Sequence, residues 1–362
     1  MKIVADENIP FVNRYFGNVT NLQLLPGRSI AHRDLIDADV LLVRSVTYVT
    51  EDLLKNTRVK FVGSATTGFD HLDIEWLNEA GIAWSIAKGC NAAAVVEYVI
   101  CVIAALQKMD FLNQSKPRAG VIGVGTIGQQ VAQKLEQLGF DIVYCDPFRN
   151  DINSTPLEKM TDLDLITLHV PLTRHGSHPT YHMINEHFLK NQKKNGVLLN
   201  TSRGKVISFE DLKMHGQHLV WCLDVWENEP DVDFDILEPA IIATPHIAGY
   251  SVQSKFRGIE MLYRDAVQQK IIPDRHIPLE QFPLRDLSFE GKNADWRDVV
   301  LTLFNPNAVT AQMKEVLMEN AEAFDHLRKT FKHRDEFAFV NIENVVLSET
   351  DKNILHELGV GA

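Results

Sequence analysis

Short apolar runs alternate with polar, helix-like stretches along most of this 362-residue chain. Each run is as long as a buried β-strand, and the stretches between the runs carry helix-capping residues and terminal glycines. This alternation predicts parallel sheets covered by helices on both faces, and therefore an α/β fold. The predicted strands lie at 2–6, 40–45, 60–66, 81–86, 119–124, 141–146, 163–170, 196–201, 219–225 and 240–245.

The alternation falls into two blocks, and a chain of this length is expected to form two or three domains. The first block ends near residue 90, where a long apolar stretch predicts a buried helix over 91–109. The second block begins at Ala119, after a polar segment that contains Pro117. An amphipathic helix is predicted over 251–271, followed by a proline-rich break. From about residue 287 onward, helical stretches surround one strand-like run, EFAFVNI, which predicts a third, smaller unit.

Charge and cysteine usage exclude several classes of protein. The net charge is −12 and there is no block of Lys or Arg, so no nucleic-acid partner is expected. The N-terminus lacks the apolar core of a signal peptide, and the most apolar stretch, 92–106, is too short to span a bilayer. Four scattered cysteines without a CxxC pair indicate reduced thiols in a cytoplasmic protein (Cys90, Cys101, Cys145 and Cys222).

A glycine-rich turn follows the first strand of the second block. The sequence GVGTIG has the GxGxxG spacing that lets a backbone approach a pyrophosphate at a helix N-terminus. Asp146 ends the next predicted strand, where a carboxylate binds the adenine ribose and repels a 2′-phosphate. The turn therefore predicts NAD binding, with a turn made only for packing as the alternative. The predicted cofactor contacts here are Gly123, Gly125, Thr126, Ile127, Gly128 and Asp146.

Ionisable side chains follow three consecutive predicted strands of the second block. Arg203, Glu229 and His246 should emerge at the carboxyl edge of the sheet, where open α/β sheets bind ligands. A neutral imidazole can take a hydroxyl proton, a carboxylate can orient it, and a guanidinium can hold a substrate carboxylate. This set predicts hydride transfer from a 2-hydroxy acid. Taken singly, each residue also has an ordinary interpretation, as a helix cap, a turn residue or a loop histidine.

The motifs NTSRG, CLDVWENEP and TPHIAGYS, downstream of GxGxxG, resemble those of the D-2-hydroxyacid dehydrogenases. A closer similarity, to the members that oxidise a phosphorylated four-carbon acid, is carried by ADENIP, LLVRSVT, FVGSATTGFDHLD and GCNAAAVVEYV. The resemblance implies a flavodoxin-like substrate domain (1–92 and 251–275) and a Rossmann-type NAD-binding domain (93–250). It also fits a small C-terminal α/β unit (285–362), which is too short to bury much surface alone and is expected to form a homodimer.

Residue roles follow from this resemblance by position. Arg203, Glu229 and His246 are the expected catalytic residues, with His246 as acid and base. Further cofactor contacts are expected at Val170, Thr201, Ser202, Arg203, Asp224 and Gly249, and the contact of Val170 should be through its backbone. Substrate contacts are expected at Ser45, Thr66 and Tyr250. Arg44, Lys255 and Arg257 are candidates for binding the substrate phosphate.

Three alternatives remain at this stage. The histidines His175, His178 and His182 have no carboxylate or cysteine at ligand spacing, so no metal site is expected. A phosphoglycerate or other 2-hydroxyacid dehydrogenase is the alternative within the same family, and Tyr250 argues against the phosphoglycerate enzymes. A non-enzymatic protein that senses NAD is the alternative from another class. The expected partner is a small phosphorylated hydroxy acid, with no nucleic acid and no membrane.

Overall fold

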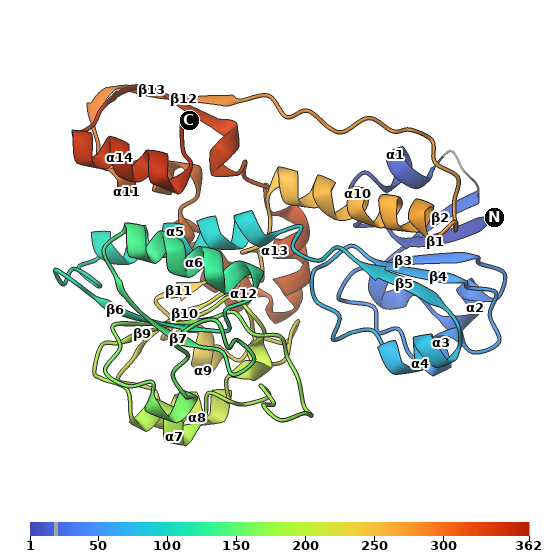
Figure 1. Ribbon diagram of the computed structural model, residues 1–362, viewed down its shortest axis with the longest axis horizontal. Coiled ribbons are helices and arrows are strands. Elements are labelled where there is room, and N and C mark those ends of the chain that lie inside the picture. Colours follow the sequence, from blue (N-terminus) through green and yellow to red (C-terminus); the bar gives the residue numbers. More distant parts are fainter. Residues whose placement is uncertain (18–20, 362) are drawn as a thin grey trace. The chain divides into compact units, whose positions relative to one another are not determined.

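The computed structural model describes residues 1–17 and 21–361, and Figure 1 shows its course. The chain divides into two compact units. The first contains Met1–Asn91 and Ser251–Phe282, and the second contains Ala92–Tyr250 and Pro283–Ala362. Each unit is built on its own parallel sheet, as the α/β alternation predicts.

The first unit has a five-stranded parallel sheet with the order β2-β1-β3-β4-β5, which is the flavodoxin-like order. Four of its strands were predicted, and the edge strand β2 was missed. The sequence of β2, NLQLL, is half exposed along its length and therefore lacks the continuous apolar run of a central strand. The strands are β1 (Lys2–Asp6), β2 (Asn21–Leu25), β3 (Val40–Val43), β4 (Phe61–Ser64) and β5 (Ala83–Ile86).

Helices cover both faces of this sheet (Figure 1). Helices α1 (Val12–Phe16) and α10 (Val252–Gln268) bury Tyr15, Phe16, Ile259 and Tyr263 against one face. The other face is covered by α2 (His32–Leu35), α3 (Glu51–Leu54) and α4 (Ile74–Glu79). The Ser251 hydroxyl caps α10 by accepting a hydrogen bond from the Ser254 N–H, 2.9 Å away. The helix predicted over 251–271 therefore belongs to the same unit as the first 91 residues.

The second unit has a six-stranded parallel sheet with the order β11-β10-β9-β8-β6-β7. The chain reverses its direction of travel across the sheet between β6 and β8, which is the switch point where doubly wound sheets bind ligands. All six strands were predicted from the sequence. They are β6 (Arg118–Ile122), β7 (Asp141–Cys145), β8 (Leu165–Leu168), β9 (Val197–Asn200), β10 (Val220–Leu223) and β11 (Ile242–Ala243).

Two hydrophobic cores lie on the two faces of this sheet. Helices α5 (Ala92–Lys108) and α6 (Thr126–Gln137) cover one face, together with α11 (Trp296–Leu303) and α14 (Glu349–Leu358). Helices α7 (Glu186–Lys190), α8 (Phe209–His215) and α9 (Phe234–Leu237) cover the other, together with α12 (Pro306–Glu319) and α13 (Phe324–Thr330). The C-terminal helices are thus part of the cores of the second unit.

The C-terminal residues also form a two-stranded parallel sheet, β12 (Arg285–Asn293) and β13 (Val340–Val346). The sequence predicted a single strand at EFAFVNI, and this was wrong in two respects. Phe337–Phe339 forms a 3₁₀ turn before β13, and β12 was missed because its sequence, RDLSFEGKN, is largely polar and exposed. Helices α12 and α13 are separated at Asn320, whose side chain accepts a hydrogen bond from the Glu322 N–H at 3.0 Å.

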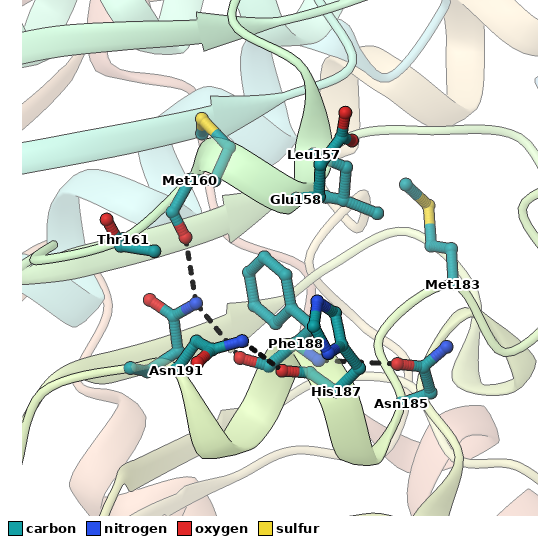
Figure 2. Close-up of a pocket in the computed structure, with 10 residues that line it drawn as sticks. Leu157, Glu158, Met160, Thr161, Met183, Asn185, His187, Phe188 and Asn191 are labelled. Carbon is teal, nitrogen blue, oxygen red and sulfur yellow. Dashed lines mark hydrogen bonds between the residues drawn. The ribbon is translucent and has the colours of Figure 1, made fainter.

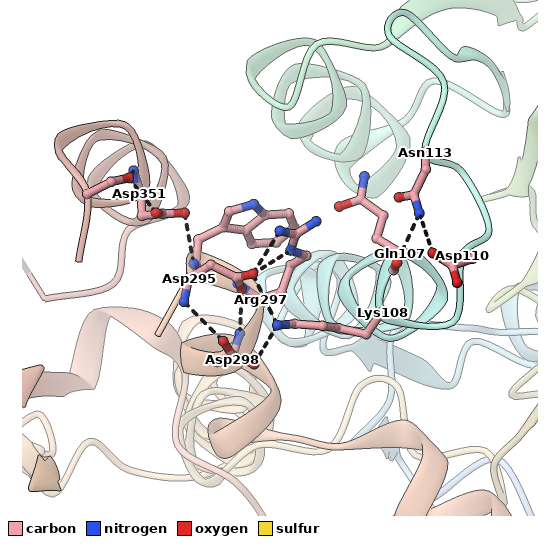
Figure 3. A network of polar contacts seen from close by, with 10 residues as sticks. Gln107, Lys108, Asp110, Asn113, Asp295, Arg297, Asp298 and Asp351 are labelled. Atoms are coloured by element: carbon pink, nitrogen blue, oxygen red, sulfur yellow. Dashed lines mark hydrogen bonds and ion pairs between the residues drawn. The ribbon is translucent and has the colours of Figure 1, made fainter. Parts of the chain in front are cut away.

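A polar network joins α11 to the C-terminal end of α5 (Figure 3). Asp295 caps α11 by accepting from the N–H groups of Arg297 (2.9 Å) and Asp298 (3.1 Å). Lys108 donates to the Asp295 carboxylate (3.1 Å) and pairs with Asp298 (2.7 Å). Asp351 of α14 accepts from the Trp296 N–H at 3.1 Å. Burial acts against the charge of Asp295, but its hydrogen bonds with Arg297 and Lys108 outweigh burial and lower its pKa to about 2.

All four cysteines are buried and free of disulfide bonds. Burial raises the pKa of Cys101 to about 12 and that of Cys145 to about 11, so both side chains are neutral thiols at physiological pH. Within residues 1–17 and 21–361, no helix combines the length and the apolar character needed to cross a membrane.

Candidate active site

The glycine-rich turn connects β6 to α6 at the switch point of the second sheet. A Cβ atom on Gly123, whose φ is 86°, would lie 2.7 Å from the carbonyl oxygen of His169. A Cβ atom on Gly128 would lie 1.9 Å from the carbonyl oxygen of Gly123. At Gly125, by contrast, a Cβ atom would have no heavy atom within 4 Å. Two of the glycines therefore allow close packing, and the middle one faces open space.

This open space fits the pyrophosphate of a dinucleotide. Helix α6 begins at Thr126, followed by Ile127. Its N-cap, Gly125, has no side chain that could accept hydrogen bonds from the backbone N–H groups of the first helical turn. Asp146 accepts hydrogen bonds from the N–H groups of Val124 (2.9 Å) and Phe148 (3.1 Å), which hold its carboxylate beside the turn. Val170, after β8, also adjoins the turn, with Cγ1 2.7 Å from the Cβ position of Gly123.

A buried hydroxyl on the next strand supports the same interpretation. Thr201 follows β9, and its Oγ1 is buried with no hydrogen-bond partner among the described residues. An unsatisfied buried hydroxyl is rare in a folded protein, and a polar ligand group is one way to satisfy it. The residues predicted to bind NAD thus include both open backbone donors and an unused hydroxyl.

Asp224, a predicted cofactor contact, is buried inside the loop that carries His246. Its carboxylate accepts three hydrogen bonds, from the Thr244 hydroxyl (2.6 Å) and from the N–H groups of Ile247 (2.8 Å) and Ala248 (2.9 Å). Burial raises the pKa of Asp224, although His246 and these hydrogen bonds act in the opposite direction. The His246 N–H also donates to the Asp224 carbonyl oxygen at 2.7 Å. Asp224 therefore fixes the shape of the loop.

His246 and Glu229 form a close pair at the carboxyl edge of the second sheet. The His246 Nδ1 lies 2.8 Å from the Glu229 Oε2, and the Glu229 Oε1 accepts from the Trp226 N–H at 3.0 Å. His246 has a φ of 55°, a left-handed conformation that the contacts with Asp224 maintain. Nδ1 faces a carboxylate, so Nδ1 carries the proton and Nε2 is the basic nitrogen.

The charge of Glu229 is favoured by its neighbours. Burial acts to raise the pKa of this carboxyl group, but His246 and the Arg328 guanidinium outweigh burial, and the pKa lies below its usual range. Glu229 is therefore ionised at neutral pH and can stabilise a protonated imidazole. The arrangement is the carboxylate–histidine pair that acid–base catalysis uses.

Arg203 lies in a tight turn after β9 that Asn200 holds in place. The Asn200 side chain accepts from the Ser202 N–H (3.0 Å) and hydroxyl (2.8 Å), and donates to the Arg203 carbonyl oxygen (2.9 Å). The next residue, Gly204, packs directly on the chain before Glu229, since a Cβ atom there would lie 2.0 Å from the carbonyl group of Trp226. Gly204 thus lets the Arg203 turn and the Glu229 loop approach each other.

The predicted substrate residues of the first unit lie after neighbouring strands of its sheet. Ser45 follows β3, and Thr66 follows β4, where its hydroxyl lies 2.9 Å from that of Ser64. Arg44 donates to the fully buried Asp6 at 2.9 and 3.4 Å, so its guanidinium already has an anionic partner. Arg257 donates from Nε to the Cys90 carbonyl oxygen at 2.9 Å.

Residues of the C-terminal segment also contact the loop that carries His246, and these contacts were not predicted from the sequence. Arg334 donates to the carbonyl oxygens of Ala248 and Tyr250, each at 3.0 Å, on either side of Gly249. Arg328 donates to the Tyr250 hydroxyl at 3.3 Å. No local motif marks either arginine, because both contacts depend on how the C-terminal segment packs on the second unit.

The histidine-rich segment has a carboxylate partner that sequence spacing did not reveal. His182 Nε2 lies 2.7 Å from the Glu227 Oε1, which comes from the loop between β10 and α9. His178 packs edge-to-face on Phe148, with ring centroids 5.4 Å apart. Within the described part of the chain, no group of three or more His, Cys, Asp or Glu side chains is arranged to hold a metal ion.

A separate hollow of the second unit, shown in Figure 2, is lined by residues near η2 (Leu157–Lys159) and α7. Its lining includes Met160, Met183, Phe188 and Gln192. The Gln192 amide donates to the carbonyl oxygens of Met160 (2.8 Å) and Phe188 (3.1 Å). None of the predicted catalytic, cofactor or substrate residues lines this hollow.

Comparisons with known proteins identify the family of this chain. The family described as "D-isomer specific 2-hydroxyacid dehydrogenase, NAD binding domain" matches residues 103–248. The chain is 43% identical over 350 residues to a Coxiella burnetii protein named erythronate-4-phosphate dehydrogenase, covering 94% of this chain and 95% of that protein. It is 40% identical to a protein of the same name from Hahella chejuensis, covering 95% and 94% of the two chains.

Solved structures share the fold. An NAD⁺-bound 3-phosphoglycerate dehydrogenase from Entamoeba histolytica matches with a TM-score of 0.64 and 22% identity, over 78% of this chain and 99% of that chain. A D-lactate dehydrogenase from Aquifex aeolicus, complexed with NAD and lactic acid, matches with a TM-score of 0.60 and 25% identity, over 75% and 96%. By these similarities the chain belongs to the D-isomer-specific 2-hydroxyacid dehydrogenase family, among the members named erythronate-4-phosphate dehydrogenase.

Proposed function

We propose that this protein oxidises 4-phospho-D-erythronate at C2 to (R)-3-hydroxy-2-oxo-4-phosphooxybutanoate with NAD, as a step of pyridoxine 5′-phosphate (vitamin B6) biosynthesis. The relatives named erythronate-4-phosphate dehydrogenase support the substrate, because they match about 95% of the chain. The observation that carries the chemistry is the His246–Glu229 pair, with 2.8 Å between Nδ1 and Oε2, in the unit that has the glycine-rich turn.

In this mechanism His246 is the general base. With Nδ1–H donated to Glu229, Nε2 accepts the proton of the C2 hydroxyl group as the C2 hydrogen leaves with its electron pair. NAD, when bound, supplies the acceptor for that hydride. Glu229, ionised and held by the Trp226 N–H, stabilises the imidazolium that forms. The residues that would hold NAD are those of the Gly123–Gly128 turn, Asp146 and Thr201.

Arg203 is proposed to bind the substrate carboxylate. Its guanidinium presents two parallel N–H donors, a geometry that fits a carboxylate and that lysine cannot reproduce. We propose Ser45, Thr66 and Tyr250 as further substrate contacts, and Val170, Ser202 and Gly249 as further cofactor contacts. Asp224 would contribute to the cofactor site by fixing the loop that carries His246 and Gly249.

We further propose that the protein is a homodimer joined through its C-terminal segment, and that it works in the cytoplasm. A two-stranded sheet alone is only marginally stable in water, and β12 is exposed along most of its length. Pairing with a second copy would cover it. Four buried cysteines that form no disulfide bond agree with a reducing compartment.

The test of the substrate is a direct comparison of two acids. NADH formation should be measured with 4-phosphoerythronate and with 3-phosphoglycerate, which is one carbon shorter and would leave the phosphate contacts unmade. We expect a preference in kcat/KM for the four-carbon acid on the order of 10² or more. Equal values of kcat/KM, or a preference for 3-phosphoglycerate, would refute the assignment of 4-phosphoerythronate as the substrate. The assignment to the dehydrogenase class would still hold. No NADH with either acid would favour a binding protein.

A further inference from the structure

Helix α13 holds a cation beside the active-site loop. Phe324 and Leu327 anchor this helix in the core, and Arg328 follows them with only 9% of its side chain exposed. Its Nη2 donates to the Tyr250 hydroxyl at 3.3 Å, a long hydrogen bond. Its ion pair with Asp325 is also long, 3.7 Å from Nη1 to Oδ1. The buried Nε has no hydrogen-bond partner among the described residues.

These contacts compensate the charge of Arg328 only in part. A guanidinium carries five N–H donors and is charged at every accessible pH, so burying it is costly unless anions or several acceptors surround it. The Tyr250 hydroxyl is neutral, and Asp325 lies beyond hydrogen-bond distance. Glu229 is close enough for its pKa to be lowered by Arg328, but its two oxygens are engaged with His246 and Trp226. The guanidinium can therefore donate hydrogen bonds to a further anion.

The position of Arg328 relative to the base is fixed by a short loop. Only three residues separate His246 from Tyr250, and the loop between them is held by Asp224 on one side and Arg334 on the other. The Tyr250 ring lies 6.0 Å from the Arg328 guanidinium carbon. The loop that begins at His246 therefore ends at Tyr250, whose hydroxyl contacts Arg328 of α13.

We propose that Arg328, together with the Tyr250 hydroxyl, binds the phosphate group of the substrate and makes the enzyme specific for phosphorylated acids. The inference rests on the proposed function, since it assigns the far end of the same substrate. A phosphate dianion offers three acceptor oxygens to the planar guanidinium, which is the geometry that such pairs favour. Arg44 is less suited to this role because it already pairs with buried Asp6. The C-terminal segment thus contributes to substrate recognition.

The test compares two substrates in one variant. In Arg328→Met, kcat/KM for 4-phosphoerythronate should fall on the order of 10²-fold more than kcat/KM for unphosphorylated erythronate, which shares only the loss caused by removing a positive charge near Glu229. Arg328→Lys, which keeps a point charge, should retain part of the preference. Inorganic phosphate should inhibit the NAD-loaded wild type competitively, with an inhibition constant at least about tenfold higher in Arg328→Met.

Arg334→Met is the matched control, because Arg334 contacts the same loop only through carbonyl oxygens. It should lower activity with both acids by the same factor. An equal loss with both acids in Arg328→Met, or no change in phosphate inhibition, would overturn the proposal and leave Arg328 a structural residue. If Arg328→Met fails to fold, the test is made with Arg328→Lys, by comparing its kcat/KM for 4-phosphoerythronate with its kcat/KM for erythronate. A wild type that is inactive with 4-phosphoerythronate would refute the proposed function instead.

Discussion

At the scale of single residues, two glycines of the second unit have opposite surroundings. Gly204 is in contact with the Trp226 backbone, whereas Gly125 faces open space. Gly204→Ala should therefore destabilise the fold by about 1–3 kcal/mol or more and reduce activity with it. Gly125→Ala should leave the melting temperature unchanged but weaken NAD binding by about tenfold or more, because its methyl group would occupy the space proposed for the pyrophosphate. Calorimetry measures the melting temperature of each variant, and NAD titration measures its affinity for NAD. If the two substitutions lower the melting temperature equally, the roles assigned to the two glycines are wrong.

The two glutamates of one loop provide a second comparison. Glu229 pairs with His246, and Glu227 pairs with His182 at nearly the same distance, 2.8 and 2.7 Å. Glu229→Gln should slow turnover by on the order of 10² and move the acidic limb of the oxidation pH profile to lower pH. The reason is that a neutral amide no longer stabilises the imidazolium. Glu227→Gln should leave that limb in place. A pH–rate profile in which both variants behave alike would show that Glu229 is not the partner of the base.

The proposed catalytic residues are the part of the candidate site that sequence spacing could indicate. Arg203, Glu229 and His246 follow consecutive strands, and parallel strands bring their carboxyl ends to one edge, so spacing alone indicates their neighbourhood. Arg328 and Arg334 could not be found in this way. Their contacts with the loop depend on tertiary packing of residues some 80 positions further along the chain, and no periodicity or motif records such packing.

At the scale of elements, strands were predicted where both faces are buried and missed where they are exposed. The six strands of the second sheet are apolar runs covered by helices on both sides, which makes them visible in sequence. The missed strands, β2 and β12, are half exposed or largely exposed, so their residues are mixed in character. Their strand conformation is set by the neighbouring strand, β1 or β13, rather than by their own sequence.

The N-cap of α11 should stabilise the fold in a pH-dependent way. The pKa of Asp295 is lowered to about 2, below its value in an unfolded chain, so its contribution is fully present above about pH 4 and lost as pH falls towards 2. Asp295→Asn should cost about 2 kcal/mol at pH 7, and the deficit relative to wild type should shrink between pH 4 and pH 2. Urea titrations of wild type and variant at the two ends of this pH range measure the deficit in the free energy of unfolding. The exposed Glu319→Gln is the control, and a deficit independent of pH would contradict the assignment.

At the scale of the whole molecule, the proposed dimer can be tested on the exposed apolar residues that flank the small sheet. Leu284 is 59% exposed before β12, and Val346 is 54% exposed at the end of β13. Replacing both with Asp should convert a particle of twice 41.0 kDa into one of 41.0 kDa in light scattering. Met214→Asp, an equally exposed position on α8, should leave the mass unchanged. A double variant that keeps the larger mass would place the interface elsewhere.

The first unit is discontinuous, and this has a consequence for how the chain folds during synthesis. The strands of its sheet are complete at Ile86, but one face of that sheet is covered by α10, which lies beyond residue 250. A ribosome must therefore translate all of 92–250 before Ile259 and Tyr263 can reach that face. During that interval the side chains of β1, β3 and β4 that point to this face are covered by α1 without α10, and a chaperone that recognises exposed hydrophobic strands would find its binding site there.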